Sequence, residues 1–102
     1  MDVYLDNKEL ENLYTSGKSR KLRLPESVID KFFSTIQKIE AASTIQDLIT
    51  DNGLRFEKLK ATTRHYSMRL SLKYRLEVEV VWINQNETIG KFYLKNISNH
   101  YG

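Results

Sequence analysis

The sequence predicts an α+β fold, in which N-terminal helices pack on one face of a small antiparallel β-sheet. Up to residue 53, apolar residues recur mostly at three- and four-residue spacing, which is typical of amphipathic helices. After residue 53 they mostly alternate with polar residues, which is typical of half-buried strands. The length of 102 residues, with 40% hydrophobic and 28% charged residues, predicts one domain, residues 1–102, around a single core.

The chain is expected to begin with a short strand followed by a helix. Residues 3–5 can form the strand, and Asp6 or Asn7 can cap a helix that runs to about Tyr14. Residues 15–17 then end this helix, because they include a glycine.

A longer amphipathic helix is expected over residues 26–42, with Pro25 suited to its first turn. Its apolar residues recur at helical spacing: Val28, Ile29, Phe32, Phe33, Ile36 and Ile39. Ser43 or Thr44 can cap one further helical turn, and residues 51–53 close the helical half.

The second half of the chain reads as an antiparallel meander. A strand is expected around residues 56–59. Residues 66–83 alternate but are too many for one strand, so a turn must fall near residues 71–73. Residues 84–87 form a hairpin turn, and residues 88–97 form the last strand.

The composition excludes several classes of function. No cysteine is present, so the chain has no disulfide, no thiolate nucleophile and no cysteine zinc site. His65 and His100 lie 35 residues apart, which disfavours a histidine metal site, and we expect no metal and no cofactor. The sequence has no apolar run of membrane-spanning length, and its acidic start does not resemble a signal peptide. We therefore expect a cytoplasmic protein that binds no membrane.

Positive charge is concentrated in two segments. Residues 54–75 carry seven Lys or Arg against a single acid, Glu57, and residues 18–23 carry four cations in six positions. Cations can bind phosphates and aromatic rings can stack on bases, so this distribution indicates a nucleic-acid partner, RNA in particular. The RNA-binding candidates are Lys18, Arg20, Lys21, Arg23, Arg64, His65, Tyr66, Arg69 and Lys73.

Each of these features also has a purely structural interpretation. Charged residues between 69 and 79 could form a cross-strand ladder on a solvated face. The loop at 18–23 could simply be solvated, and Tyr66 and Tyr74 could pack at the edge of the core. The histidine and tyrosine at 100–101 could be a frayed end.

The order and spacing of several short segments resemble one protein family. The segments are residues 13–20, 39–48, 54–60, 66–70, 74–76 and 97–101. Together they resemble the HigB branch of the RelE/ParE superfamily, the toxins of bacterial type II toxin–antitoxin modules. The resemblance implies a RelE-like, microbial-RNase-like fold and a ribosome-dependent mRNA endonuclease. It also implies a helix-turn-helix (HigA-like) antitoxin encoded beside the toxin, and operator DNA contacted only through their complex.

The chemistry of such an enzyme needs no metal. The neighbouring 2′-hydroxyl attacks the phosphate in line, a base takes its proton, cations hold the extra charge, and an acid protonates the leaving 5′-oxygen. By resemblance, Lys60 and Arg75 match the functional basic positions, and His100 and Tyr101 supply proton transfer. Relatives usually carry tyrosine before histidine, so the choice between His100 and Tyr101 stays open. Glu57 stands where some relatives have a catalytic histidine.

Two other functions are compatible with the same resemblance. One is a ParE-like inhibitor that binds a topoisomerase without nuclease chemistry. The other is a degenerate toxin that acts only as an antitoxin-binding corepressor. Loss of toxicity on substitution of Arg75 and His100, with antitoxin binding intact, would favour the nuclease.

Overall fold

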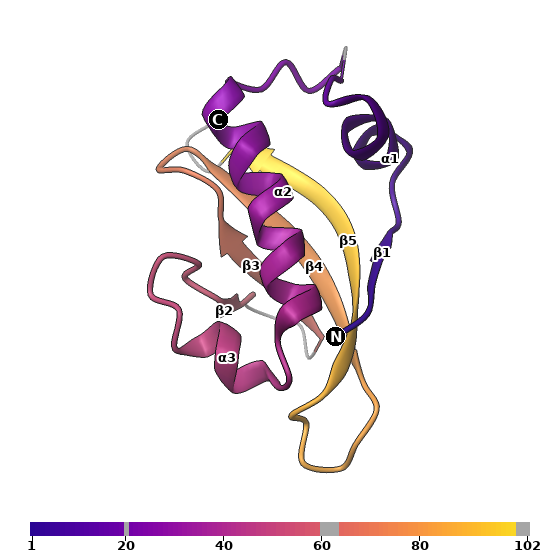
Figure 1. The fold of residues 1–102 in the computed structure, drawn as a ribbon, viewed down its shortest axis with the longest axis vertical. Helices are drawn as coiled ribbons and strands as arrows, with labels where there is room; N and C mark the ends of the chain where they lie inside the picture. The colour runs from indigo at the N-terminus through magenta and orange to yellow at the C-terminus, as the bar shows by residue number, and fades with distance from the viewer. Residues whose placement is uncertain (20, 60–63, 100–102) are drawn as a thin grey trace.

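The computed structural model describes residues 1–19, 21–59 and 64–99. A strand comes first, then three helices, then four more strands (Figure 1). The elements are β1 (Val3–Leu5), α1 (Lys8–Ser16), α2 (Glu26–Ala41), α3 (Ile45–Ile49), β2 (Glu57–Lys58), β3 (His65–Arg69), β4 (Tyr74–Trp82) and β5 (Gly90–Asn99). Within the described ranges, no helix has both the length and the apolar character needed to cross a membrane.

The first helix has the caps that the sequence predicts. The Asn7 side chain accepts hydrogen bonds from the backbone N–H groups of Glu9 and Leu10, which satisfies two donors at the start of α1. At the other end Gly17 adopts a left-handed backbone with φ of 72°, and its N–H donates to the carbonyl of Leu13. This geometry favours glycine because it has no Cβ atom.

The other two helices also form where local sequence signals place them. α2 follows Pro25, which lacks the N–H that a first turn would leave unpaired. α3 starts with a capping box. The Thr44 side chain accepts a hydrogen bond from the backbone of Asp47, and the Asp47 carboxylate accepts one from the backbone N–H of Thr44. The predicted helices are therefore confirmed, with bounds that agree to within a residue or two.

The five strands form one sheet in the order β1-β5-β4-β3-β2. Strands β2 to β5 pair with antiparallel neighbours, which confirms the predicted meander. β1 is the exception, because it pairs in parallel with β5, with Val3 opposite Phe92. Between β1 and β5 the chain passes through three helices and the strands β2, β3 and β4, and parallel pairing requires a long connection of this kind.

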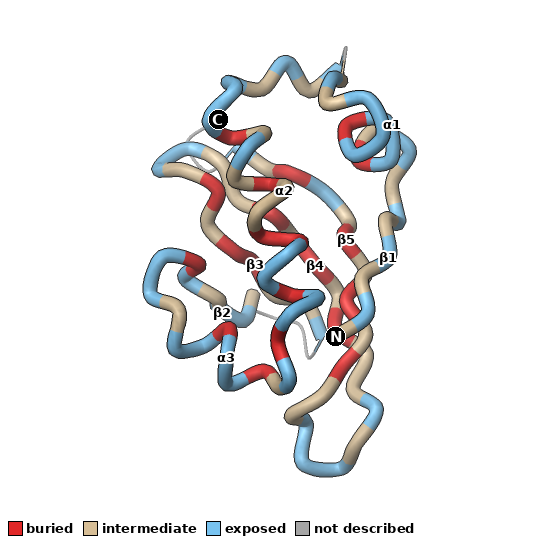
Figure 2. The backbone as a smooth tube through the Cα atoms, in the orientation of Figure 1, coloured by how far each residue is buried: buried red, intermediate tan, exposed pale blue. Residues whose placement is uncertain are grey.

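The core lies between α2 and one face of the sheet. α2 crosses this face obliquely (Figure 1), and buried segments recur along α2, β3, β4 and β5 (Figure 2). Phe32 from α2 and Phe92 from β5 are the largest fully buried side chains. Each buried side chain of this size contributes roughly 1.5–3 kcal/mol. Within the described ranges no helix covers the other face of the sheet, and we call it the open face.

The last strand starts and ends two residues later than the predicted 88–97. Its late start follows from the preceding turn. The side-chain oxygen of Asn84 accepts hydrogen bonds from the N–H groups of Thr88 and Ile89, at 3.0 and 3.2 Å. These bonds hold the N–H groups of both residues in the turn, and β5 begins at the next residue, Gly90.

β5 also contains a bulge. Lys95 is an extra residue, because its neighbours Leu94 and Asn96 pair with consecutive residues of β4. Beyond the bulge, the alternation of buried and outward-facing residues continues one position later in the sequence. As a result Leu94 and Ile97 are both buried although they are three positions apart.

One surface ion pair allows a test of pH-dependent stability. Lys38 donates to the Asp51 carboxylate at 2.8 Å, and this bond lowers the pKa of Asp51 below its usual value. The folded state therefore gains stability above the ordinary carboxyl range and loses it as the pH falls through the lowered pKa. The two side chains are 42% and 30% exposed, so we expect Lys38→Met to lower the free energy of unfolding by less than about 1 kcal/mol at pH 7.

Urea denaturation at pH 7 and at about pH 3 would measure this difference. The difference between wild type and Lys38→Met should shrink at the lower pH. Lys8→Met is the matched control, since no ion pair of Lys8 is found in the described part of the chain. An equal loss for Lys38→Met at both pH values would mean that the lysine acts through packing and not through Asp51.

Candidate active site on the open face

The open face presents most of the polar side chains of the sheet. Strand register and alternation place these residues on it: Tyr4, Glu57, His65, Ser67, Arg69, Arg75, Glu77, Glu79, Tyr93, Asn96 and Ser98. Arg69 and Arg75 lie directly opposite each other, and Ser98 of β5 lies on the other side of Arg75. The structure therefore confirms the predicted sharing of one face by Arg69 and Arg75.

Arg75 is held in place by several hydrogen bonds. Its Nε donates to the hydroxyl of Ser67 at 2.9 Å, and its Nη2 donates to the carbonyl of Arg55 at 2.8 Å. Only 13% of its side chain is exposed. Because the planar guanidinium is fixed and always charged, it is preorganised to bind an anion such as a phosphate.

The carbonyl that binds Arg75 is presented by an unusual backbone conformation. Arg55 has φ of 47°, in the left-handed region that disfavours a side chain by about 1–2 kcal/mol. The turn that contains it is tied to the sheet, since the N–H of Arg69 donates to the carbonyl of Leu54 at 2.6 Å. The strained turn thus delivers the Arg55 carbonyl to the guanidinium of Arg75.

The two opposed arginines concentrate positive charge at one end of the open face. Like charges directly across a strand pair repel each other. Neither a hydrogen bond nor an ion pair is found for the Arg69 side chain within the described residues. A bound anion between the two guanidinium groups would remove this repulsion.

A carboxylate stands beside this pair. Glu57 pairs with Ser67 across β2 and β3, and its Oε2 lies 3.8 Å from Nη2 of Arg75. Its side chain is 58% exposed, so it is accessible from solution. The open face therefore combines a fixed cation, a second cation and an accessible proton acceptor.

The other acids of this face have partners away from the arginines. Glu77 accepts a hydrogen bond from Asn96 at 3.4 Å. Glu79 lies 3.6 Å from the ammonium of Lys95, which also binds Asp6. The bond to Asp6 raises the pKa of Lys95. Lys95 thus compensates the charge of Glu79, whereas the hydrogen-bond partner of Glu77 is a neutral amide.

Tyr66 lies on the opposite side of the sheet from the arginines. Its ring stacks on Phe56 with centroids 4.8 Å apart and meets Trp82 edge-on at 6.2 Å. Burial and the charge of Glu87 raise the pKa of its hydroxyl. Tyr66 and Tyr74 both pack at the edge of the core, so the structure does not bring Tyr66 together with Arg75.

The remaining predicted RNA-binding residues are spread over three places. Lys18, Lys21 and Arg23 come from the loop between α1 and α2, and not from the sheet. Lys73 is exposed in the turn between β3 and β4, and Arg64 is exposed just before β3. His65 is on the open face, but four residues along β3 from Arg69, about 13 Å at the rise of a strand.

Several predicted site residues lie outside the described ranges. They are Arg20, Lys60, His100 and Tyr101. Within the described ranges, no three His, Asp or Glu side chains are grouped so as to hold a metal ion.

The sequence reading missed three contributors to the site: Glu57, Ser67 and the carbonyl of Arg55. The family resemblance marks Glu57 only as a position where some relatives have a histidine, although it is the single acid of a strongly basic segment. A single acid among seven cations indicates that Glu57 lies close to positively charged side chains. Ser67 and the Arg55 carbonyl gave no signal, because their role depends on strand register and on a backbone conformation.

The fold resembles that of a solved toxin structure. The structure of a "YoeB/ParE toxin from Agrobacterium tumefaciens" aligns with a TM-score of 0.61 over 99% of this chain and 100% of that one. The two sequences are 13% identical, so this likeness concerns the fold alone. A search of curated proteins found no match.

The family follows from the sequence. The family model described as "RelE-like toxin of type II toxin-antitoxin system HigB" matches residues 4–96. The chain belongs to this family of toxins, which confirms the resemblance described above. Membership of the family implies an antitoxin partner.

Proposed function

We propose that the protein is a ribosome-dependent mRNA endonuclease that inhibits translation, and that the open face around Arg75 is its active site. The observation that carries this proposal is the fixed guanidinium of Arg75, with Arg69 opposite and the Glu57 carboxylate 3.8 Å away. This combination supplies the phosphate ligands and the proton acceptor that metal-free RNA cleavage requires. The proposed surroundings are the cytoplasm, with a HigA-like antitoxin as the inhibitor.

The reaction can be written with named groups. Glu57 takes the proton of a ribose 2′-hydroxyl while the 2′-oxygen forms a bond to phosphorus. Arg75 and Arg69 stabilise the extra negative charge on the phosphoryl oxygens. The bond from phosphorus to the 5′-oxygen breaks, and that oxygen takes a proton, which the family resemblance assigns to His100 or Tyr101. The products are a 2′,3′-cyclic phosphate and a free 5′-hydroxyl.

Primer extension on a reporter message in a purified translation system tests the proposal. We expect codon-phased cuts that appear only when ribosomes are present. Intact message together with arrested cell growth would contradict the proposal and would direct attention to a topoisomerase instead. Binding of antitoxin with no effect on either message or growth would indicate a corepressor.

We expect Glu57→Gln to slow the cleavage by about a hundredfold, because an amide cannot take up the proton of the 2′-hydroxyl. Glu77→Gln is the matched control, since Glu77 and Glu57 lie on either side of Ser67 in the same row of the open face. Single-turnover cleavage by ribosome-bound toxin gives both rates. Equal rates for the two variants would remove Glu57 from the mechanism.

A further inference from the structure

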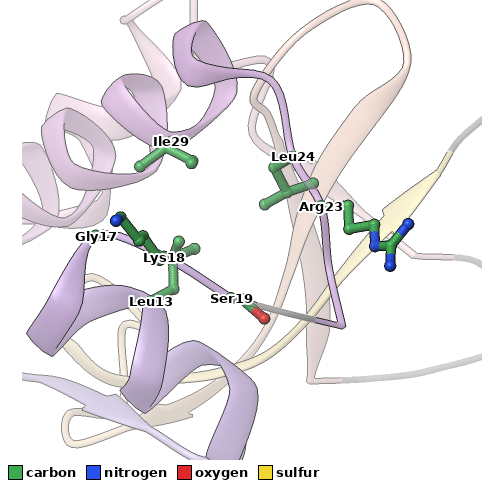
Figure 3. A pocket seen from close by; sticks show the side chains of 7 residues that line it. All are labelled: Leu13, Gly17, Lys18, Ser19, Arg23, Leu24 and Ile29. Atoms are coloured by element: carbon green, nitrogen blue, oxygen red, sulfur yellow. The ribbon is translucent and has the colours of Figure 1, made fainter.

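A small pocket lies on the helical side of the molecule, between the end of α1 and the start of α2. It has a volume of about 320 Å³ and is lined by Leu13, Gly17, Lys18, Ser19, Arg23, Leu24 and Ile29. In Figure 3, Leu13, Leu24 and Ile29 approach the same space from three sides. The volume is at the lower end of the range for binding pockets, which suits a single inserted side chain.

The walls of the pocket and its rim differ in character. Aliphatic side chains form the walls, and Leu24 and Ile29 remain only partly buried, so apolar surface is open to a partner. Lys18 and Arg23 are exposed, and Figure 3 shows their charged ends on opposite sides of the pocket. Among the described lining residues there is neither an acid nor an aromatic ring.

This combination favours a protein partner over RNA. An RNA site needs cations together with aromatic faces for stacking bases, and an aliphatic pocket contributes nothing to either. A peptide that places a bulky apolar side chain between carboxylates would match both the walls and the rim. Glu9, which lines the adjoining hollow, already accepts a hydrogen bond from Ser19 at 3.1 Å.

We propose that this pocket receives a bulky apolar side chain from an acidic segment of the antitoxin, whose carboxylates pair with Lys18 and Arg23. The pocket would then be a docking site separate from the open face. The loop that forms it lies at the same end of the molecule as the turn between β3 and β4 (Figure 1). A bound segment would therefore lie at the end of the molecule that also carries Arg75.

The deciding variant is the double charge reversal Lys18→Glu/Arg23→Glu, because both side chains are exposed and the fold does not depend on them. Isothermal titration of each toxin variant with the purified antitoxin encoded beside it gives Kd. We expect the double variant to raise Kd by at least about tenfold. Lys8→Glu/Lys31→Glu, with the same change of charge on helices outside the pocket, should leave Kd within about threefold of wild type.

A second variant tests the apolar walls. Leu24→Ser should raise Kd about tenfold, whereas Ile83→Ser, at an exposed position in the loop between β4 and β5, should not. Leu24→Ser should also keep the ribosome-dependent cleavage of wild type. Replacing the matching antitoxin carboxylates by lysine should restore the affinity of the charge-reversed toxin.

Unchanged antitoxin affinity of the charge-reversed toxin would overturn the proposal. If that variant also lost ribosome binding, Lys18 and Arg23 would be assigned to RNA. Because these measurements use affinities, they remain decisive even if the protein proves to have no nuclease activity.

Discussion

The Arg75→Ala protein is expected to cut ribosome-bound message about a thousandfold more slowly than wild type. The guanidinium is fixed by Ser67 and by the carbonyl of Arg55, so its charge needs no reorganisation when the phosphate gains negative charge. Removal of the side chain eliminates this preorganised charge. Single-turnover cleavage of a reporter message by saturating toxin measures the effect directly.

Two controls separate chemistry from folding in this experiment. Arg75→Lys keeps the charge but loses the planar fork, so it should restore only a small part of the rate. Lys91→Ala removes a cation that lies opposite Val81, well away from Arg75 along β4. This variant should cut at the rate of wild type. Arg75→Ala should still bind the antitoxin. Wild-type cleavage by a folded Arg75→Ala protein would remove the open face from the proposed mechanism.

Phe32→Ala should lower the free energy of unfolding by about 3–5 kcal/mol, because it leaves a cavity between α2 and the sheet. The Phe32 side chain is completely buried, and its ring meets that of Phe33 edge-on with centroids 5.7 Å apart. A domain of this size has only about 5–15 kcal/mol of stability in total, so the variant should be close to unfolding at physiological temperature. Urea denaturation followed by the fluorescence of Trp82 gives the value.

Ile49→Ala is the matched control for the core variant. Ile49 is 51% exposed at the end of α3, and its truncation should cost less than about 0.5 kcal/mol. A loss below 1 kcal/mol for Phe32→Ala would be incompatible with a helix that packs on the sheet through this ring.

Local patterns were sufficient to predict most of the fold. The caps at Asn7, Gly17 and Thr44 are local signals, and each helix begins or ends where its cap predicts. The parallel pairing of β1 could not be predicted, because three residues carry no information about their partner strand. The bulge at Lys95 had a visible signal, since the spacing of Leu94 and Ile97 breaks the period of two.

The candidate site was predictable only in part. Alternation along β4 and across the turn predicted that Arg75 and Arg69 would share a face. The contribution of Glu57 required the register of β2, a strand of only two residues. Tyr66 carries flanking charges that suggest RNA, yet the ring packs on Phe56, because its neighbours in sequence lie on the other face of the sheet.

The position of β5 between β1 and β4 has a consequence for folding during synthesis. Among the described strands β1 pairs only with β5, so β1 cannot join the sheet until β5, far later in the chain, is available. β4 can pair with β3 earlier, but its other edge stays unpaired until β5 is available and places Ser98 beside Arg75. Such distant pairing makes folding slow and delays completion of the sheet until β5 has been synthesised. The group of open-face side chains that includes Glu57, Arg75 and Ser98 can therefore be assembled only after the ribosome has translated the described chain through β5.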